Sequence, residues 1–262
     1  MRESRQVRAN VKSAPLAWLI ARPVAHRGLH DAARGIIENM PGAVKAAIAG
    51  NFAIECDIQL TSDGEAVVHH DDELGRLTDG GGALLQKSTA ELKAMRFKDT
   101  DEHMMTLADL CSLVAGRVPL VIEVKSHFDG DRKLVKRMAE VLSSYSGPAV
   151  GMSFDPDQVL ALRELIPSRP RGIVAEHDYT AQEWPDASPA QRREMTHLRH
   201  FFRTRPDFVA YWVDELPSTA PWLARNLFGC PLLTWTVRTG EQRARAARHA
   251  DQMIFEGFVP GT

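Results

Sequence analysis

Two acidic residues, Glu55 and Asp57, lie two positions apart in an otherwise apolar run, AIECDIQL. Alternate side chains of a β-strand point to opposite faces, so a strand over this run places both carboxylates on one face. Neighbouring carboxylates repel each other, and a protein tolerates such a pair when a cation lies between them. The run therefore predicts a metal site.

A third carboxylate, Glu123, interrupts a second apolar run, LVIEVK, which ends at Lys125. Three carboxylates are hard oxygen ligands that suit Mg²⁺ or Ca²⁺, with water and substrate oxygens completing the shell. The alternative is a charge network in which Lys125 and Arg27 neutralise the acids. Three acids against two cations still leave an excess of negative charge, which favours a bound divalent ion.

Two histidines, His26 and His70, are candidates for acid–base chemistry because histidine titrates near neutral pH. His26 ends a short apolar run, and His70 ends the segment that follows the acidic run. Two histidines on either side of a phosphate can act as general base and general acid. Arg27 and Lys125 can bind the phosphate oxygens. His69 points the other way if the strand persists, so we interpret it as structural.

These residues must be positioned by a repeating pattern of strands and helices. Apart from one hairpin, eight runs are predicted as core strands: 22–26, 53–58, 120–125, 149–154, 172–175, 208–213, 232–237 and 252–256. Helical patterns separate most neighbours, and eight such units in about 240 residues are typical of a (β/α)₈ (TIM) barrel. The alternative is a doubly wound open sheet, but no GxGxxG or GxxxxGK[ST] loop supports it.

One segment breaks the repeat after the second strand. Thr61-Ser-Asp-Gly64 is too short for a parallel crossover, so 65–69 must run back antiparallel as a hairpin. We interpret 61–105 as an insertion within a single domain of residues 1–262. In a barrel, active groups lie at the carboxyl ends of the strands, where the acidic and histidine residues above are expected.

Composition excludes several classes of protein. The 262 residues carry 32 Lys and Arg against 34 Asp and Glu, a net charge of −2, so no basic field favours nucleic acid or an anionic membrane. No apolar run reaches the ~20 residues of a membrane span, so stable membrane insertion is not expected. The three scattered cysteines are predicted to be free thiols in a reducing compartment.

The N-terminus faintly matches a signal peptide, since Arg2, Arg5, Arg8 and Lys12 precede the apolar run 14–21. That run is barely long enough, and cleavage after it would fall at the start of the first core strand. We therefore interpret the segment as uncleaved and predict a cytoplasmic protein. A secreted or periplasmic location is the alternative.

The ordered motifs closely resemble those of the glycerophosphodiester phosphodiesterase family over about residues 22–256. The matching elements are His26-Arg27-Gly28, Glu38-Asn39, Glu55-x-Asp57, Thr61-x-Asp63-Gly64, Val67-Val68-x-His70-Asp71, Leu74-x-Arg76-x-Thr78, Thr106-Leu107, Ile122-Glu123-x-Lys125, Ser153-Phe154 and Trp235-Thr236-Val237. Family members are (β/α)₈ barrels with a small insertion after the second strand. They hydrolyse glycerophosphodiesters, which are small molecules, to an alcohol and sn-glycerol 3-phosphate with a divalent cation.

The resemblance also implies a role for each site residue. The implied set is His26 and His70 for acid–base catalysis, Glu55, Asp57 and Glu123 for the metal, and Arg27, Lys125, Glu38 and Trp235 for phosphate or substrate. We favour His70 as the acid that protonates the leaving alkoxide and His26 as the base, and the reverse assignment stays open. Attack by water and attack by a glycerol hydroxyl through a cyclic phosphate are both compatible with the sequence.

One departure from the family concerns the last strand, which usually ends in a Thr-Asp-Pro-like segment. Here the chain reads IFEGFVP over 254–260, which bears on the choice of substrate. A lysophospholipase D-type or phospholipase C-like activity on a lipid is the second hypothesis, but the polar segment 176–206 does not favour it. A non-catalytic phosphodiester-binding protein is the third, and the filled catalytic positions argue against it. Head group and oligomeric state are left open.

Overall fold

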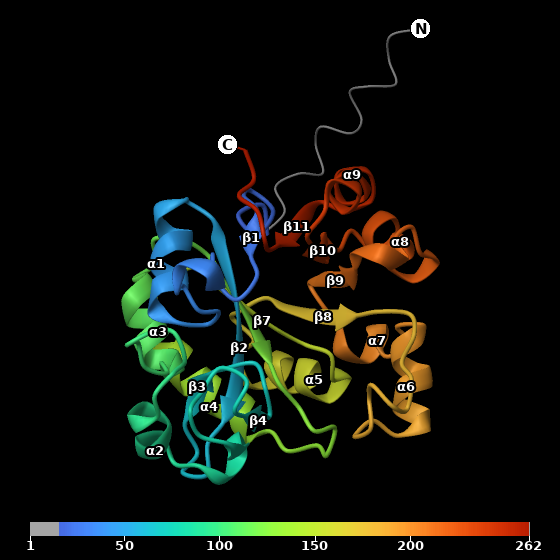
Figure 1. Ribbon diagram of the computed structural model, residues 1–262. Coiled ribbons are helices and arrows are strands. Elements are labelled where there is room, and N and C mark those ends of the chain that lie inside the picture. Colours follow the sequence, from blue (N-terminus) through green and yellow to red (C-terminus); the bar gives the residue numbers. More distant parts are fainter. Residues whose placement is uncertain (1–15, 262) are drawn as a thin grey trace, which may run out of the picture.

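The computed structural model describes residues 16–261, and eight parallel strands in it close into a barrel (Figure 1). The barrel strands are β1 (Val24–Ala25), β2 (Ala53–Leu60), β6 (Leu120–Val124), β7 (Ala149–Ser153), β8 (Arg171–Ala175), β9 (Phe208–Trp212), β10 (Leu232–Val237) and β11 (Gln252–Phe255). The sheet closes because β1 pairs with β2 on one side and with β11 on the other. The predicted TIM barrel is confirmed, and the open sheet is excluded.

Helices cover the outside of the barrel between successive strands (Figure 1). They are α1 (Pro41–Ala49), α3 (Leu107–Val114), α4 (Lys133–Ser143), α5 (Pro156–Leu165), α6 (Pro189–Thr196), α7 (Phe201–Thr204), α8 (Thr219–Asn226) and α9 (Gly240–His249), with short 3₁₀ turns at Ala32–Arg34, Leu84–Gln86 and Val213–Glu215. Thr106 caps α3 through a reciprocal pair of hydrogen bonds with Asp109, which satisfies amides that the helix itself leaves free.

The alternation predicted for β2 decides which side chains enter the barrel. Ile54, Cys56 and Ile58 point outward and pack in the layer between strands and helices. Ala53 packs inside the barrel, and Glu55 and Asp57 follow it on the same face. β2 and β6 are aligned so that Asp57 lies beside Glu123. The register therefore brings the three predicted carboxylates together.

Below the carboxylates, the barrel interior is apolar. Phe208, Met152 and Leu233 are among the side chains that fill it. Leu16 and Leu19 from the segment before β1 are buried in this same cluster. The basic residues Arg2, Arg5, Arg8 and Lys12 lie outside the described residues.

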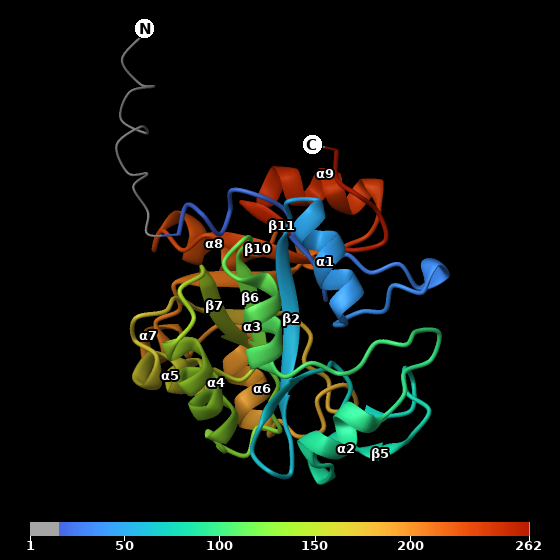
Figure 2. The same ribbon diagram turned by 90° about the vertical axis from the view of Figure 1, so that its left-hand side faces the viewer.

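The predicted hairpin is present, and it opens an insertion with its own core. β3 (Ala66–Val68) runs antiparallel to β2, and the side chain of Thr61 accepts the N–H of Glu65 across the turn. The insertion then forms β4 (Glu73–Leu74), β5 (Gly82–Ala83) and α2 (Thr89–Ala94). Its small core comprises Ile37, Met40, Val67, Leu74, Leu84, Leu92, Phe97 and Met104. In Figures 1 and 2 the insertion, cyan to teal, lies beyond the end of β2.

Two segments are interrupted by left-handed backbone. The helical region over 189–204 is divided into α6 and α7, because Leu198 adopts a left-handed backbone (φ 49°) and turns its side chain into the core. β1 is shorter than the predicted 22–26, since Pro23 has no N–H to donate and Arg27 (φ 53°) leaves the extended region. His26 nevertheless continues the pairing, because its N–H donates to Phe255 O.

Gly172 on β8 provides a test of packing inside the barrel. It pairs with Phe208 on β9, and a Cβ at Gly172 would lie 2.3 Å from the buried Phe208 ring. We expect Gly172→Ala to lower the free energy of unfolding by about 2 kcal/mol, as overpacking of a full core does. Urea denaturation measures the effect. Gly240→Ala is the matched control, because open space surrounds that position, and a loss as large there would contradict the packing argument.

Candidate active site

A cavity of about 290 Å³ opens at the carboxyl ends of the barrel strands, and we call it the mouth cavity. Its lining includes every residue predicted for catalysis, metal or phosphate binding except Glu38. The lining residues are His26, Arg27, Glu55, Asp57, His70, Glu123, Lys125, Met152, Phe154, Val174, Glu176, Trp212, Trp235, Thr236, Arg238 and Ile254. Four strands (β1, β2, β6 and β10) or their ends and the insertion contribute the predicted groups, so residues distant in sequence meet in one place.

The three carboxylates converge at the wall of this cavity. One oxygen from each of Glu55, Asp57 and Glu123 lies within 4.8 Å of the others, and all three side chains are buried. Lys125 Nζ lies 2.9 Å from Asp57 Oδ1 and 2.7 Å from Glu123 Oε1. Arg27 Nε lies 3.3 Å from Asp57 Oδ2. The two cations of the predicted charge network are therefore both centred on Asp57.

Positive charge is unevenly distributed among the three carboxylates. Burial would raise the pKa of Asp57, but the charges of Lys125 and Arg27 outweigh it and hold that pKa well below its usual range. At Glu55 burial raises the pKa well above its usual range, and the charges of Asp57 and Glu123 raise it further. The side-chain cations thus pair with Asp57 and, through Lys125, with Glu123, and they leave Glu55 with too little positive charge.

This imbalance fits a divalent cation. Three carboxylate oxygens facing one point are the donor set of Mg²⁺ and Ca²⁺, and a cation there would allow Glu55 to ionise. Asn39 holds the cluster from behind, since its amide donates to Asp57 Oδ2 at 2.9 Å. The metal site predicted from the sequence is therefore consistent with the geometry of the residues present.

His26 is oriented by the opposite end of the chain. Its Nδ1 lies 2.5 Å from Glu256 Oε2, just past β11. Burial would raise the pKa of Glu256, but the hydrogen bond from His26 lowers it, so this carboxylate is ionised and can only accept. Burial lowers the pKa of His26. A neutral His26 must then carry its proton on Nδ1, which leaves Nε2, 3.9 Å from Glu55 Oε2, as the free acceptor.

Glu256 has two further neighbours. His30 Nε2 lies 3.5 Å from Glu256 Oε2, and Arg238 Nε lies 2.5 Å from Oε1. His26, His30 and Glu256 also bring ligand atoms within 4.8 Å of one another. The guanidinium of Arg238 already supplies positive charge there, so we interpret this second group as a hydrogen-bonded support for His26.

His70 is carried to the rim by the hairpin. Its Nδ1 lies 2.8 Å from Asp71 Oδ1, so the other ring nitrogen, Nε2, points away from Asp71. The side chain of Gln59 on β2 donates to His70 O at 2.9 Å, and His69 N donates to Asp57 O. The backbone of the histidine pair is thus tied to the strand that carries the carboxylates. As predicted, His69 is buried away from the cavity, where its ring contacts Phe97 edge-on.

Glu38 does not line the mouth cavity but supports the residues that do. It lies 2.7 Å from both Arg27 and Arg76. Arg76 also binds Asp71, the partner of His70. Burial would raise the pKa of Glu38, but its hydrogen bonds to Arg76 and Arg27 lower it to about 2. This chain of ion pairs connects the two histidine-bearing segments.

Several residues of the site received no role from the sequence. Arg76 was part of a recognised motif, but its partners are set by the fold of the insertion. Glu176 follows the apolar strand β8 directly, a pattern like that of the predicted acids, and burial raises its pKa to about 7. Trp212 and Arg238 line the mouth cavity opposite the carboxylates. Trp235, which was predicted, stacks on Trp212 with ring centroids 6.4 Å apart.

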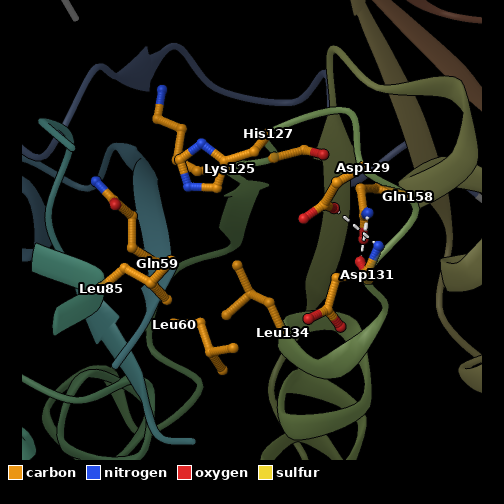
Figure 3. Close-up of a pocket in the computed structure, with 10 residues that line it drawn as sticks. Gln59, Leu60, Leu85, Lys125, His127, Asp129, Asp131, Leu134 and Gln158 are labelled. Carbon is orange, nitrogen blue, oxygen red and sulfur yellow. Dashed lines mark hydrogen bonds between the residues drawn. The ribbon is translucent and has the colours of Figure 1, made fainter. Parts of the chain in front are cut away.

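A second, smaller hollow, next to the hairpin, is unsuited to a phosphodiester. Figure 3 shows that Leu60 and Leu134 lie between Gln59 and Asp131 in it. Its volume is about 70 Å³, room for a few waters at most. The amino group of Lys125 forms an ion pair with a carboxylate of the mouth cavity rather than serving this hollow.

An enzyme that acts on lipids would be expected to carry exposed apolar side chains beside its cavity. Exposed apolar side chains Trp222 and Phe228 lie at α8 and do not line the mouth cavity. None of the helices in residues 16–261 is both long enough and apolar enough to span a bilayer.

Comparison with known proteins finds relatives over most of the chain. The model of the glycerophosphoryl diester phosphodiesterase family matches residues 26–254. A glycerophosphodiester phosphodiesterase from Caldanaerobacter subterraneus is 30% identical over 234 residues, 85% of this chain and 88% of that protein. Human glycerophosphodiester phosphodiesterase 1 is 26% identical over 254 residues, 86% of this chain and 74% of that protein.

A solved structure shares the fold. The phosphodiesterase of Oleispira antarctica, in complex with the product sn-glycerol-3-phosphate, superposes with a TM-score of 0.73 at 20% identity. The match covers 89% of this chain and 91% of that one.

The ion pairs of Glu38 predict a dependence of stability on pH. Its pKa is about 2 in the folded protein against an ordinary 4.5, so its stabilising effect is complete above pH 4.5 and is lost as the pH falls toward 2. Glu38→Gln should therefore lower the free energy of unfolding by about 2 kcal/mol at pH 7. The difference in the free energy of unfolding between Glu38→Gln and the wild type should become smaller at lower pH.

Urea denaturation at pH 7, 5, 4 and 3 measures this difference. Glu140→Gln is the control, because Glu140 forms an exposed ion pair on α4 and should change stability little at any pH. A Glu38→Gln deficit that is constant from pH 7 to pH 3 would show that the ion pairs are not its cause.

Proposed function

The chain belongs to the glycerophosphoryl diester phosphodiesterase family, and we propose that it hydrolyses glycerophosphodiesters to an alcohol and sn-glycerol 3-phosphate through His26, His70 and a divalent cation. The observation that carries this proposal is the convergence of two histidines, three carboxylates and two cations on one cavity. The product named for the Oleispira antarctica neighbour, sn-glycerol-3-phosphate, supports the choice of product.

Glu55, Asp57 and Glu123 would hold Mg²⁺ or Ca²⁺ in this proposal. Positive charge held there would polarise the phosphoryl group and stabilise the charge that develops on it. Arg27 and Lys125 bind the remaining phosphate oxygens from the side of Asp57. The cluster then provides positive charge around the phosphate even though three of its side chains are acidic.

His26 is the general base. Its Nε2 is a free acceptor that faces the mouth cavity, because Nδ1 is engaged by Glu256. When Nε2 takes a proton, the ionised Glu256 stabilises the resulting imidazolium. The nucleophile it activates is water or a hydroxyl of the substrate's own glycerol.

His70 is the general acid. Its Nδ1 is bonded to Asp71, which orients the ring, and its Nε2–H donates to the oxygen of the leaving alcohol. His70 lies on the insertion and His26 follows β1, so the two histidines reach the mouth cavity from different segments of the chain. Burial lowers the pKa of His26, and a neutral ring with a free Nε2 supports its assignment as the base, which leaves His70 as the acid.

The reaction is tested with the purified protein and Mg²⁺ or Ca²⁺. We expect release of sn-glycerol 3-phosphate from glycerophosphocholine or glycerophosphoethanolamine, measured by a coupled dehydrogenase assay, and loss of activity with EDTA. His26→Ala and His70→Ala should each lower kcat by about 100-fold or more. His103→Ala is the control because His103 is exposed and lines no cavity of the site. Full activity in His70→Ala or after complete metal removal would refute the mechanism.

The roles of the two histidines are tested by changing the leaving group. The 4-nitrophenyl ester of glycerol 3-phosphate releases a phenolate that needs no protonation. His70→Ala should therefore lose much less activity on this ester than on glycerophosphocholine, whereas His26→Ala should lose about as much on both. The opposite pattern in kcat would assign the acid to His26 and the base to His70.

A further inference from the structure

A larger cavity of about 660 Å³ lies beside the mouth cavity, and we call it the side cavity. Its lining residues are His70, Asp71, Asp72, Glu123, Val124, Lys125, Ser126, Phe128, Ser153, Phe154, Asp155, Gln182, Glu183, Trp184, Pro185, Asp186 and Trp235. His70, Glu123, Lys125, Phe154 and Trp235 line both cavities, so the two meet at the phosphate-binding groups.

The histidines distinguish the two cavities. His26 lines only the mouth cavity, whereas His70 lines both. If His70 protonates the leaving oxygen, the alcohol must lie on the His70 side of the phosphate, which is the side cavity. The glycerol half then occupies the mouth cavity, where Glu176 and Arg238 offer polar groups to its hydroxyls.

Aromatic rings form one wall of the side cavity. Trp184 lies 4.7 Å from Phe154 and 6.0 Å from Phe128, measured between ring centroids. Phe154 contacts Trp235 edge-on at 5.3 Å. The four rings come from four different loops or strand ends, and together they make a continuous aromatic surface next to the phosphate groups.

Trp184 is held in place although it belongs to a polar loop. Its indole N–H donates to Glu176 Oε1 at 2.7 Å, and its ring lies 5.2 Å from that of Tyr179. Because its N–H is already bonded to Glu176, the ring has no hydrogen-bonding group left for a ligand. It can offer only its π surface, which is negative at the face.

The polar residues of the side cavity are mostly acidic. Asp72, Glu183 and Asp186 line it, and within residues 16–261 none of them forms an ion pair with lysine or arginine. Lys125 is the one lysine or arginine in the lining, and Asp57 and Glu123 already neutralise it. A ligand in this cavity therefore meets aromatic faces and an excess of negative charge.

We propose that the side cavity binds the alcohol half of the substrate and selects an alcohol that carries a positive charge, of the choline type. This inference rests on the proposed function. A quaternary ammonium has no hydrogen-bond donor. It therefore gains more from aromatic faces and from the negative charge of carboxylates than from hydrogen-bonding groups. An anionic head group would meet repulsion from three carboxylates, and a neutral polyol would find few partners on the aromatic wall.

The test compares glycerophosphocholine with its neutral isostere, the 3,3-dimethylbutyl ester of glycerol 3-phosphate, and with glycerophosphoglycerol. We expect the highest kcat/KM for glycerophosphocholine. Trp184→Leu should lower it about 10- to 30-fold for glycerophosphocholine, the range for a cation that loses a desolvated aromatic face, and should change the neutral substrates much less. Trp222→Leu is the matched control, since that tryptophan is exposed on α8 and lines neither cavity.

The acidic residues are tested in the same assay. The double variant Glu183→Gln, Asp186→Asn should reduce the preference for glycerophosphocholine over its isostere, because kcat/KM should fall more for the charged ester than for the neutral one. Asp101→Asn is the control, because Asp101 is exposed and lies outside the side cavity. Equal kcat/KM for the charged and neutral esters, or an equal loss on both in Trp184→Leu, would overturn the inference and leave the proposed function standing.

A binding measurement is independent of turnover. Choline alone should change the tryptophan fluorescence of the wild type and not that of Trp184→Leu, whereas 3,3-dimethylbutanol should have little effect on either. If the wild type hydrolyses no glycerophosphodiester, the proposed function fails, and choline binding still decides whether the cavity recognises a cation. Equal binding of choline and 3,3-dimethylbutanol would refute the charge selectivity.

Discussion

The buried carboxylates of Glu55, Asp57 and Glu123 impose the constraint on which the rest of the site depends. They are buried on adjacent strands above an apolar barrel interior, so they cannot all be ionised without nearby cations. Lys125 and Arg27 stabilise Asp57 and leave Glu55 short of positive charge. The arrangement is therefore incomplete in the protein alone, and a cation with the phosphate of a substrate can complete it. Much of the surrounding structure serves to hold these charges at fixed positions.

That support comes from backbone conformation as well as from side chains. Arg27 and Asn39 both have left-handed backbones, with φ of 53° and 59°, which are costly for residues other than glycine. Both residues form backbone hydrogen bonds at the site: Arg27 N donates to Glu55 Oε2, and Asn39 N donates to Arg27 O. Neighbouring Gly28 cannot carry a side chain, because a Cβ there would lie 2.9 Å from Ala43 of α1. The turn after β1 is thus shaped by the carboxylates it must reach.

Much of this site could be predicted from the sequence because its signals are local. The spacing of Glu55 and Asp57 in an apolar strand specifies a shared face, and a four-residue turn at 61–64 leaves no choice but a hairpin that returns His70. The contact between Glu256 and His26 could not be foreseen, since 230 positions separate them and only closure of the barrel aligns them.

Trp184 was missed for a related reason: it lies in a polar loop without periodicity, and its place depends on Glu176. The break between α6 and α7 depends on Leu198 finding a buried position, which helical spacing alone does not reveal.

The pairing of β1 with β11 has a consequence for folding. The three carboxylates, the hairpin and both histidines precede β7, but Glu256, the partner of His26, follows β11, the eighth strand of the barrel. A chain whose barrel is still open can therefore contain nearly all the predicted catalytic groups while His26 has no fixed orientation. Closure of the barrel by β11 and orientation of the His26 ring are thus one event.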